Sequence, residues 1–145
     1  GHIHGGDNPN RICADCELHI DLRPLPGMAL DELREQLRGR LARVAGERGV
    51  GIELRPLFEG TPAMETPAGA AIVQATEALT GHAAEAVAFG TEGPYLNQLG
   101  MNTVVLGPGD IDQAHQPDEY LELARIEPTL ELLGRLIHRF CIAPD

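Results

Sequence analysis

The chain has 145 residues, of which 22 are acidic and 11 basic, giving a net charge of −11. This acidity argues against nucleic acid and anionic membrane surfaces as partners, and no apolar run in the sequence is long enough to span a bilayer. Hydrophobic residues make up 43% of the chain, which is enough for one domain or two small ones. Three cysteines, an odd number, favour reduced thiols and a cytoplasmic setting.

The first part of the chain predicts a small α+β layer. A short strand is expected at 3–6, and a second strand, with alternating apolar and polar residues, at 15–23. Leucines at helical spacing predict a helix at 28–48, and alternation returns in a third expected strand at 50–57. Strand, strand, helix, strand is most of a ferredoxin-like layer, one strand and one helix short at its N-terminus.

The remainder predicts an α/β unit. Glycines and prolines mark residues 59–67 as a linker between domains. In the following domain, 68–145, helical and strand patterns alternate, so we expect β-α-β units with parallel strands. The expected elements are a helix at 70–79, a strand at 86–89, a short helix at 94–99, a strand at 102–106 and a final helix at 128–140.

A loop with one histidine among carboxylates and amides follows the strand expected at 102–106. Gly107-Pro108-Gly109 ends that strand, and His115 comes six residues later. Open α/β sheets place ligands in loops at the carboxyl ends of their strands, so His115 is a candidate metal ligand or acid–base group. A solvated surface histidine is the alternative, because no other histidine or cysteine lies at close ligand spacing.

The other histidines and the cysteines predict no metal site by spacing. Cys13 and Cys16 form a single pair, and no second pair completes a four-ligand zinc site. His2 and His4 share a face of the first strand, where only an adventitious metal site is expected. Structural or surface roles are expected for the cysteines and for these histidines: His2, His4, His19, His82 and His138.

Five further polar residues each have an ordinary structural explanation. Asn10 lies in a segment rich in Asn and Pro, which favours a turn. Arg23 ends the polar face of the second strand, where a surface ion pair with a neighbouring carboxylate is expected. Thr91 and Glu92 stand where a helix begins and suit its capping. Glu119, four residues beyond the loop histidine, is either a solvated carboxylate or a group that orients that histidine or a loop amide.

Two stretches resemble the C-terminal part of a known family. Val105-Leu106-Gly107-Pro108-Gly109 and Gln113-Ala114-His115-Gln116-Pro117-Asp118-Glu119-Tyr120 are similar to the aminoacylase/carboxypeptidase group of two-zinc amidohydrolases, and the similarity covers essentially the whole chain. The resemblance implies that His115 is a zinc ligand. It also implies that residues 1–58 belong to a lid or dimerisation domain and residues 68–145 to the C-terminal part of the catalytic domain.

The resemblance places the rest of the machinery upstream of this chain. Most zinc ligands and the glutamate that acts as general base are expected there, so no catalytic residue is expected within the chain itself. The asparagine that matches Asn10 binds substrate or the oxyanion, commonly in the partner subunit, although Ile12-Cys13 departs from the usual Ile-Pro. Arg23, within Asp21-Leu22-Arg23-Pro24, would clamp the substrate carboxylate with its planar guanidinium. Thr91 and Glu92 would lie on the rim, with Glu92 facing a cationic substrate end.

The activity that the resemblance implies is hydrolysis of N-acetyl-L-ornithine to acetate and L-ornithine, a step of arginine biosynthesis. It implies two zinc ions, or cobalt in their place, and a homodimer formed through residues 1–58. Another N-acyl-amino-acid deacylase, such as a desuccinylase, is the alternative enzyme. The chain by itself carries neither a general base near His115 nor a full ligand set, so alone it is expected to be inactive. A non-catalytic ferredoxin-like dimerisation or binding module is therefore the alternative from another class.

Overall fold

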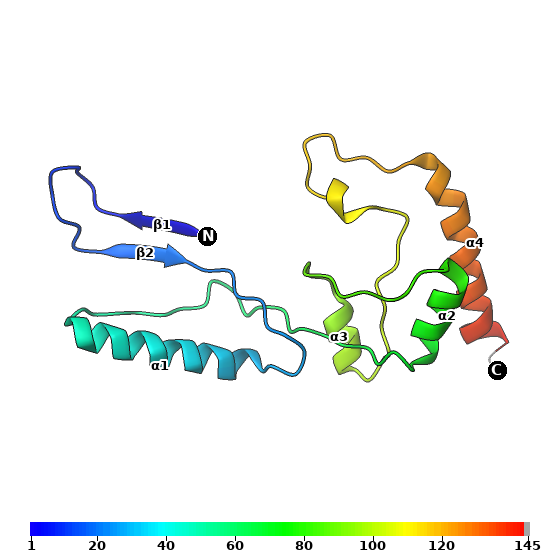
Figure 1. Cartoon of the computed structure of the whole chain (residues 1–145), viewed down its shortest axis with the longest axis horizontal. Coiled ribbons are helices and arrows are strands. Elements are labelled where there is room, and N and C mark those ends of the chain that lie inside the picture. Colours follow the sequence, from blue (N-terminus) through cyan, green and yellow to red (C-terminus); the bar gives the residue numbers. More distant parts are fainter. Residues whose placement is uncertain (144–145) are drawn as a thin grey trace. The chain divides into compact units, whose positions relative to one another are not determined.

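The computed structural model describes residues 1–143, and the chain divides into two compact units (Figure 1). The first unit is Gly1–Ala63 and the second begins at Met64. Within the described residues, no helix has the length and apolar character needed to cross a membrane. Among the described residues, the first unit contains two strands and one helix, and the second contains the remaining helices.

The first unit contains an antiparallel hairpin of β1 (His2–Gly5) and β2 (Cys16–His19). In its register Ile3 lies opposite Leu18, and His2 lies opposite His19. The ladder stops at that last pair. The strand expected over 15–23 is therefore shorter than its alternating pattern predicts.

Helix α1 (Leu30–Arg48) follows the hairpin and buries one stripe of its surface. It begins two residues later than expected, because the backbone of Ala29 before it is extended, with a φ of −78° and a ψ of 129°. It ends at Gly49, which has a φ of 67° and donates its N–H to the carbonyls of Ala45 and Gly46. The stripe contains the half-buried Leu30, Leu33, Leu37 and Leu41 and the buried Ala45.

The strand expected at 50–57 does not form, and that prediction was wrong. Among the described residues the only sheet has two strands, β1 and β2. The segment runs alongside α1 (Figure 1), and its first residue, Val50, donates its N–H to the carbonyl of Ala45 at 3.0 Å. Arg34 of α1 donates to the carbonyls of Phe58 and Glu59, and Arg55 lies 3.6 Å from the carboxylate of Glu17 on β2. Pro56 removes one N–H from any ladder that this segment could join.

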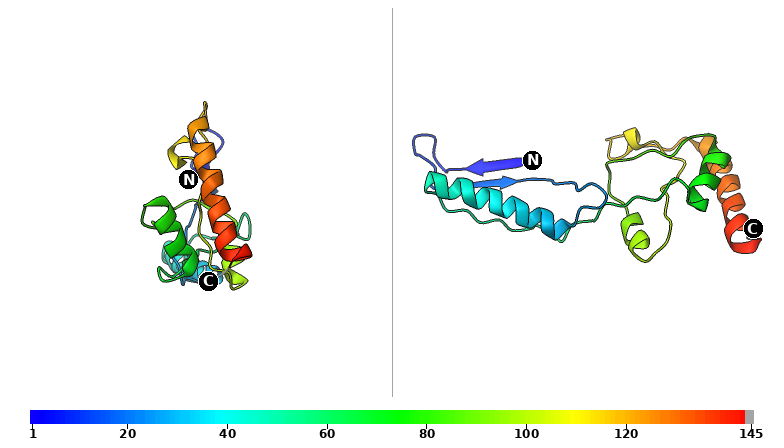
Figure 2. Two further views of the ribbon diagram at one scale, coloured as in Figure 1. Left: turned by 90° about the vertical axis from the view of Figure 1, so that its right-hand side faces the viewer. Right: turned by 60° about the horizontal axis from the view of Figure 1, so that its bottom comes forward.

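The second unit is built around the contact between α2 (Ala71–Thr80) and α4 (Ile126–Ile137), which lie side by side in Figure 2. The buried apolar side chains of these two helices are Val73 and Ala75 of α2 and Leu136 of α4. A short helix, α3 (Gly93–Gln98), and two 3₁₀ turns, η1 (Ile111–Gln113) and η2 (Leu123–Arg125), lie between them in sequence. Beyond α4 the chain continues into a π-helical turn, η3 (His138–Ile142).

The apolar stripe expected on the last helix is largely exposed. Leu130 and Ile137 are 57% and 55% exposed, whereas Leu136, which is not on that stripe, is 8% exposed. The helix also begins earlier than expected, which still leaves Pro128 in its first turn, where its missing N–H costs nothing. The helix therefore presents to α2 a different face from the one that the leucine spacing favours.

The strands expected at 86–89 and 102–106 are also absent from the described chain, so no parallel β-α-β unit is present. At Thr103 the reason is visible. The hydroxyl of Thr66 donates to the carbonyl of Thr103 at 2.5 Å and accepts its N–H at 3.2 Å. One side chain thus takes both backbone groups that a neighbouring strand would otherwise use.

The two glycines Gly39 and Gly49 give a matched test of α1. Gly49 needs its left-handed backbone to end the helix, so Gly49→Ala should lower the free energy of unfolding by about 1 kcal/mol. Gly39 lies inside the helix, and Gly39→Ala should raise that free energy by about 0.5–1 kcal/mol. An added Cβ meets nothing within 4 Å at either site, so packing does not confuse the comparison. Urea unfolding followed by circular dichroism measures both changes, and equal signs would contradict this account of the helix end.

Candidate functional site

The loop that carries His115 is a series of short hydrogen-bonded turns. Asp110 begins it, because its carboxylate accepts the N–H of Asp112 at 3.0 Å and its carbonyl accepts the N–H of Gln113 at 3.0 Å. These bonds form the 3₁₀ turn η1, which ends at Ala114. The loop is therefore ordered by its own polar groups, with local acceptors for its backbone amides.

His115 occupies an unusual place in the next turn. The N–H of Gln116 donates to the carbonyl of Gln113 at 3.3 Å. Ala114 has a φ of −64° and a ψ of 134°, and His115 has a φ of 61°. These angles fit a type II turn with the histidine at the third position, where Gly or Asn is favoured. His115 is the one non-glycine residue with positive φ among the described residues.

Glu119 closes the loop on the histidine. Its Oε2 accepts the backbone N–H of His115 at 3.0 Å, and its own N–H donates to the carbonyl of Gln116 at 3.2 Å. Of the two sequence-based alternatives for Glu119, the structure shows the carboxylate engaged with a loop amide. The imidazole of His115 is left at the exposed surface of the loop.

A hollow of about 540 Å³ lies against this loop. Its lining includes two apolar residues, one aromatic, one amide and two acidic side chains, and one glycine. The lining residues are Pro108, Gly109, Asp110, Gln113, Glu119, Tyr120 and Leu121.

The donor set for zinc is incomplete in the part of the chain that the structure describes. No group of three or more histidine, cysteine, aspartate or glutamate side chains there could hold a metal ion. Zinc in proteins takes three or four such ligands. His115 fits the chemistry of one zinc ligand, and the described residues do not complete a set of three around it.

The two candidate residues of the first unit have local partners. Asn10 lies in the hairpin loop, where its N–H donates to the side-chain oxygen of Asn8 at 3.2 Å. Arg23 lies beyond β2, and its Nε donates to the carboxylate of Asp21 at 2.9 Å. Both partners of that ion pair are exposed. The structure thus shows the turn and the surface ion pair that were expected as the ordinary explanations.

Thr91 and Glu92 stand at the start of α3. The hydroxyl of Thr91 accepts the N–H of Gly93 at 3.1 Å, whereas the Glu92 side chain makes no capping bond. Gly93 is buried against Met64, whose sulfur would lie 2.9 Å from an added Cβ. A side chain at this position would require Met64 to shift, and Glu92 is exposed at the helix N-terminus.

Of the predicted site residues, the structure brings two into direct contact, His115 and Glu119. Asn10 and Arg23 belong to the first unit, and Thr91 and Glu92 to the second. The sequence reasoning missed the left-handed backbone of His115. A signal exists, because histidine shares with Asn and Asp an enrichment in that conformation, but it is weak without the turn around it.

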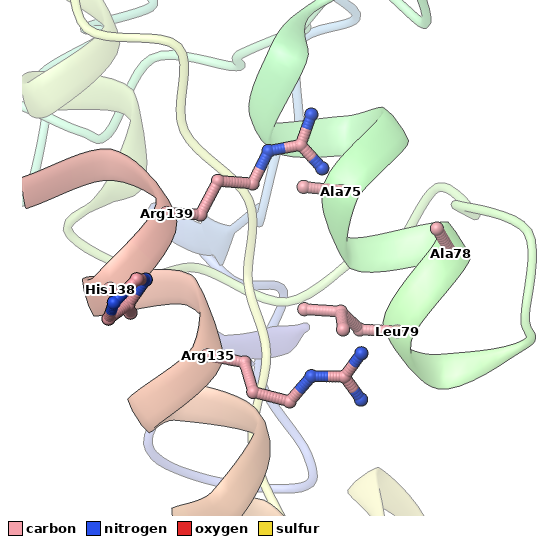
Figure 3. A pocket seen from close by; sticks show the side chains of 6 residues that line it. All are labelled: Ala75, Ala78, Leu79, Arg135, His138 and Arg139. Atoms are coloured by element: carbon pink, nitrogen blue, oxygen red, sulfur yellow. The ribbon is translucent and has the colours of Figure 1, made fainter. Parts of the chain in front are cut away.

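A second hollow, of about 390 Å³, lies between α2 and the C-terminal end of α4 (Figure 3). In Figure 3 the side chains of Arg135 and Arg139 extend from the last helix toward Leu79 and Ala75 of α2. Basic side chains at a helix C-terminus complement the helix dipole. Ala78 and His138 complete the lining, which offers no carboxylate, thiol or hydroxyl for hydrolytic chemistry.

The histidines of the hairpin also gather on one face. The His2 ring centroid lies 5.2 Å from that of His19 and 6.5 Å from that of His4. The hydrogen bond between His19 Nε2 and Glu17 Oε1, at 2.9 Å, lowers the pKa of Glu17, and the charges of His19 and Arg55 add to the effect. Because the folded pKa is the lower one, this stabilisation is present at neutral pH and is lost as the pH falls through it. The three cysteines, Cys13, Cys16 and Cys141, are free and exposed.

The chain is similar in sequence to several known proteins. It is 52% identical over 141 residues to the acetylornithine deacetylase of Edwardsiella ictaluri (strain 93-146), an alignment that covers 97% of this chain and 37% of the relative. The acetylornithine deacetylase of Aliivibrio fischeri (strain MJ11) is 49% identical with the same coverage. That of Proteus mirabilis (strain HI4320) is 48% identical over 143 residues, covering 99% of this chain and 37% of the relative.

The chain thus spans a little over a third of the length of the relatives that it matches. The model of Peptidase family M20/M25/M40 matches residues 2–139, which is nearly all of the chain. The match includes the loop of His115 and most of both units. The chain therefore belongs to Peptidase family M20/M25/M40.

Proposed function

We propose that this chain provides part of an acetylornithine deacetylase, which hydrolyses N-acetyl-L-ornithine to acetate and L-ornithine in arginine biosynthesis. Identity of 48–52% to proteins of that name, over 97–99% of the chain, supports the proposal. The structural observation that carries it is the histidine in a backbone conformation that favours glycine. Unfavourable backbone conformations persist where function requires the side chain.

His115 would hold a zinc ion together with ligands from outside this chain. A bound zinc ion, or cobalt in its place, polarises a carbonyl and activates water for attack on an amide. Within this chain the contribution is an exposed imidazole on a loop in which the His115 amide and several neighbouring amides donate to local acceptors. In this proposal, two metal ions and a glutamate from outside this chain, which acts as general base, complete the active site.

Four other residues would contact the substrate. Arg23 would bind the α-carboxylate, because a guanidinium matches a carboxylate with two parallel hydrogen bonds. Its exposed ion pair with Asp21 costs little to exchange for a ligand. Asn10, on the hairpin loop, would bind substrate or the oxyanion, and Thr91 and Glu92 would form the rim. The carboxylate of Glu92, exposed at the start of α3, suits the ammonium of ornithine.

We further propose that residues 1–58 form part of a lid domain, ferredoxin-like in design, joined by the linker 59–67 to the C-terminal part of an α/β catalytic domain. The division of the chain between Ala63 and Met64 supports this boundary. A cytoplasmic location is proposed from the free thiols of the three cysteines.

A non-catalytic binding or dimerisation module is the second candidate for the chain by itself. The observation that favours it is the absence, among the described residues, of any set of three groups able to hold a metal. A desuccinylase or another N-acyl-amino-acid deacylase is the alternative enzyme, and its substrate would differ in the acyl group or in the end that faces Glu92.

The proposed activity predicts that a chimera will be active. The chimera would carry this chain in place of the matching 141 residues of the Edwardsiella ictaluri relative. We expect it to release acetate from N-acetyl-L-ornithine and to retain zinc. We expect His115→Ala to remove most of the acetate release and most of the bound zinc. Acetate release and zinc content by atomic emission measure the two effects.

His82→Ala is the matched control, because His82 follows α2 and is exposed like His115. It should leave zinc content and activity unchanged. A chimera that prefers N-succinyl substrates would favour the desuccinylase alternative. Full zinc content and activity in His115→Ala would refute the assignment of His115.

Arg23→Lys in the same chimera tests the carboxylate clamp. An ammonium cannot reproduce the bidentate contact, so transition-state binding should weaken by about 2–3 kcal/mol, or roughly 30- to 150-fold in kcat/KM. Asp21→Asn is the control, because loss of an exposed ion pair costs less than about 1 kcal/mol. The loss in Arg23→Lys should shrink for a substrate whose α-carboxylate is amidated, and equal losses on both substrates would remove Arg23 from the site.

A homodimer formed through the first unit is also proposed. The two-stranded hairpin has unpaired edges, and its apolar residues Ile3 and Leu18 are 69% and 59% exposed. Sedimentation velocity of this chain should show a dimer, and Ile3→Glu should weaken the association. Leu123→Glu, at an apolar residue of the second unit that is 82% exposed, should leave it intact. A monomer at all concentrations would contradict the proposal.

A further inference from the structure

Resting on the proposed metal role of His115, we propose that Glu119 is its positioning residue: the carboxylate holds the histidine backbone in the left-handed conformation from which the imidazole reaches the metal. The proposal assigns Glu119 no contact with metal or substrate. It concerns the geometry of one turn, from Gln113 to Glu119.

The turn itself needs support. The third position of a type II turn requires positive φ, which glycine adopts freely and a residue with a Cβ does not. His115 has a φ of 61°, and the bond from Gln116 to Gln113 is long, at 3.3 Å. The loop therefore holds a histidine where glycine or asparagine is favoured, with only a long turn bond across it.

Glu119 supplies the missing support. Its Oε2 lies 3.0 Å from the N of His115, and a charged acceptor makes a stronger hydrogen bond than a neutral one. The turn bond from Glu119 N to Gln116 O brings residue 119 back toward the histidine. The N–H of His115 donates to the carboxylate of Glu119 and not to that of its neighbour Asp118. Residues 115–119 are thus closed into a ring through one side chain.

The ring matters because a ligand's orientation depends on the backbone that carries it. If φ at His115 relaxed to a negative value, the whole side chain would swing and the imidazole would leave its place. Groups that orient a metal ligand without touching the metal are commonly worth 10- to 100-fold in metal affinity. A comparable effect is expected here from a residue four positions along the chain.

Amide hydrogen exchange in the 145-residue chain tests the bond directly. Glu119→Ala should speed exchange at the His115 amide about five- to tenfold, the loss of one hydrogen bond. Glu119→Gln keeps a side-chain oxygen acceptor of the same length and should restore most of the protection, which separates the hydrogen bond from the charge. Asp118→Ala is the control and should change nothing. Unchanged exchange in Glu119→Ala, or equal acceleration in Asp118→Ala, would overturn the proposal.

Zinc affinity of the chimera separates this proposal from the proposed function. Glu119→Ala should weaken zinc binding 10- to 100-fold, with Glu119→Gln close to the parent. Weaker exchange protection with unchanged zinc affinity would overturn the positioning role and leave the metal role of His115 standing. Full zinc affinity in His115→Ala would instead overturn the proposed function, whatever Glu119 does.

Discussion

Backbone N–H and C=O groups need hydrogen-bond partners wherever they leave water, and the local supply of partners decides which segments of this chain form regular structure. Helices α1, α2 and α4 supply hydrogen-bond partners for their own backbone groups. The hairpin does the same, because β1 and β2 are close in sequence. Thr103 uses the hydroxyl of Thr66. The loop of His115 uses the carboxylates of Asp110 and Glu119. The candidate site is thus held by short-range polar contacts rather than by a sheet.

This dependence on local hydrogen-bond partners explains which parts of the fold can be predicted from the sequence. Helix α1 could be placed nearly to the residue, because Leu33, Leu37 and Leu41 repeat at helical spacing and Gly49 stops the helix in the left-handed conformation. The alternating pattern at 50–57 and the apolar run at 102–106 predict strands that the described chain does not form. A strand requires a second strand beside it, and periodicity within one segment carries no information about that partner.

The candidate site divides in the same way. His115 was proposed as a site residue from its loop motif, and that loop lies within the match to Peptidase family M20/M25/M40 over residues 2–139. Its φ of 61° and its bond to Glu119 were not predictable, since both arise from the turns on either side. Arg23 and Thr91 also make the contacts expected of them on structural grounds, an ion pair with Asp21 and a hydrogen bond at the start of a helix. A residue can hold a surface ion pair or a helix end and still meet a substrate, so only kinetics separates the two roles.

The central claim is that a histidine held at positive φ presents its ring to zinc. A crystal structure of the zinc-loaded chimera, with anomalous diffraction measured at the zinc edge, tests this claim most directly. The account predicts a zinc peak about 2.0–2.1 Å from a ring nitrogen of His115, with the backbone of that residue still left-handed and its amide still bonded to Glu119. A zinc site without His115, or a ligated His115 with negative φ, would contradict it.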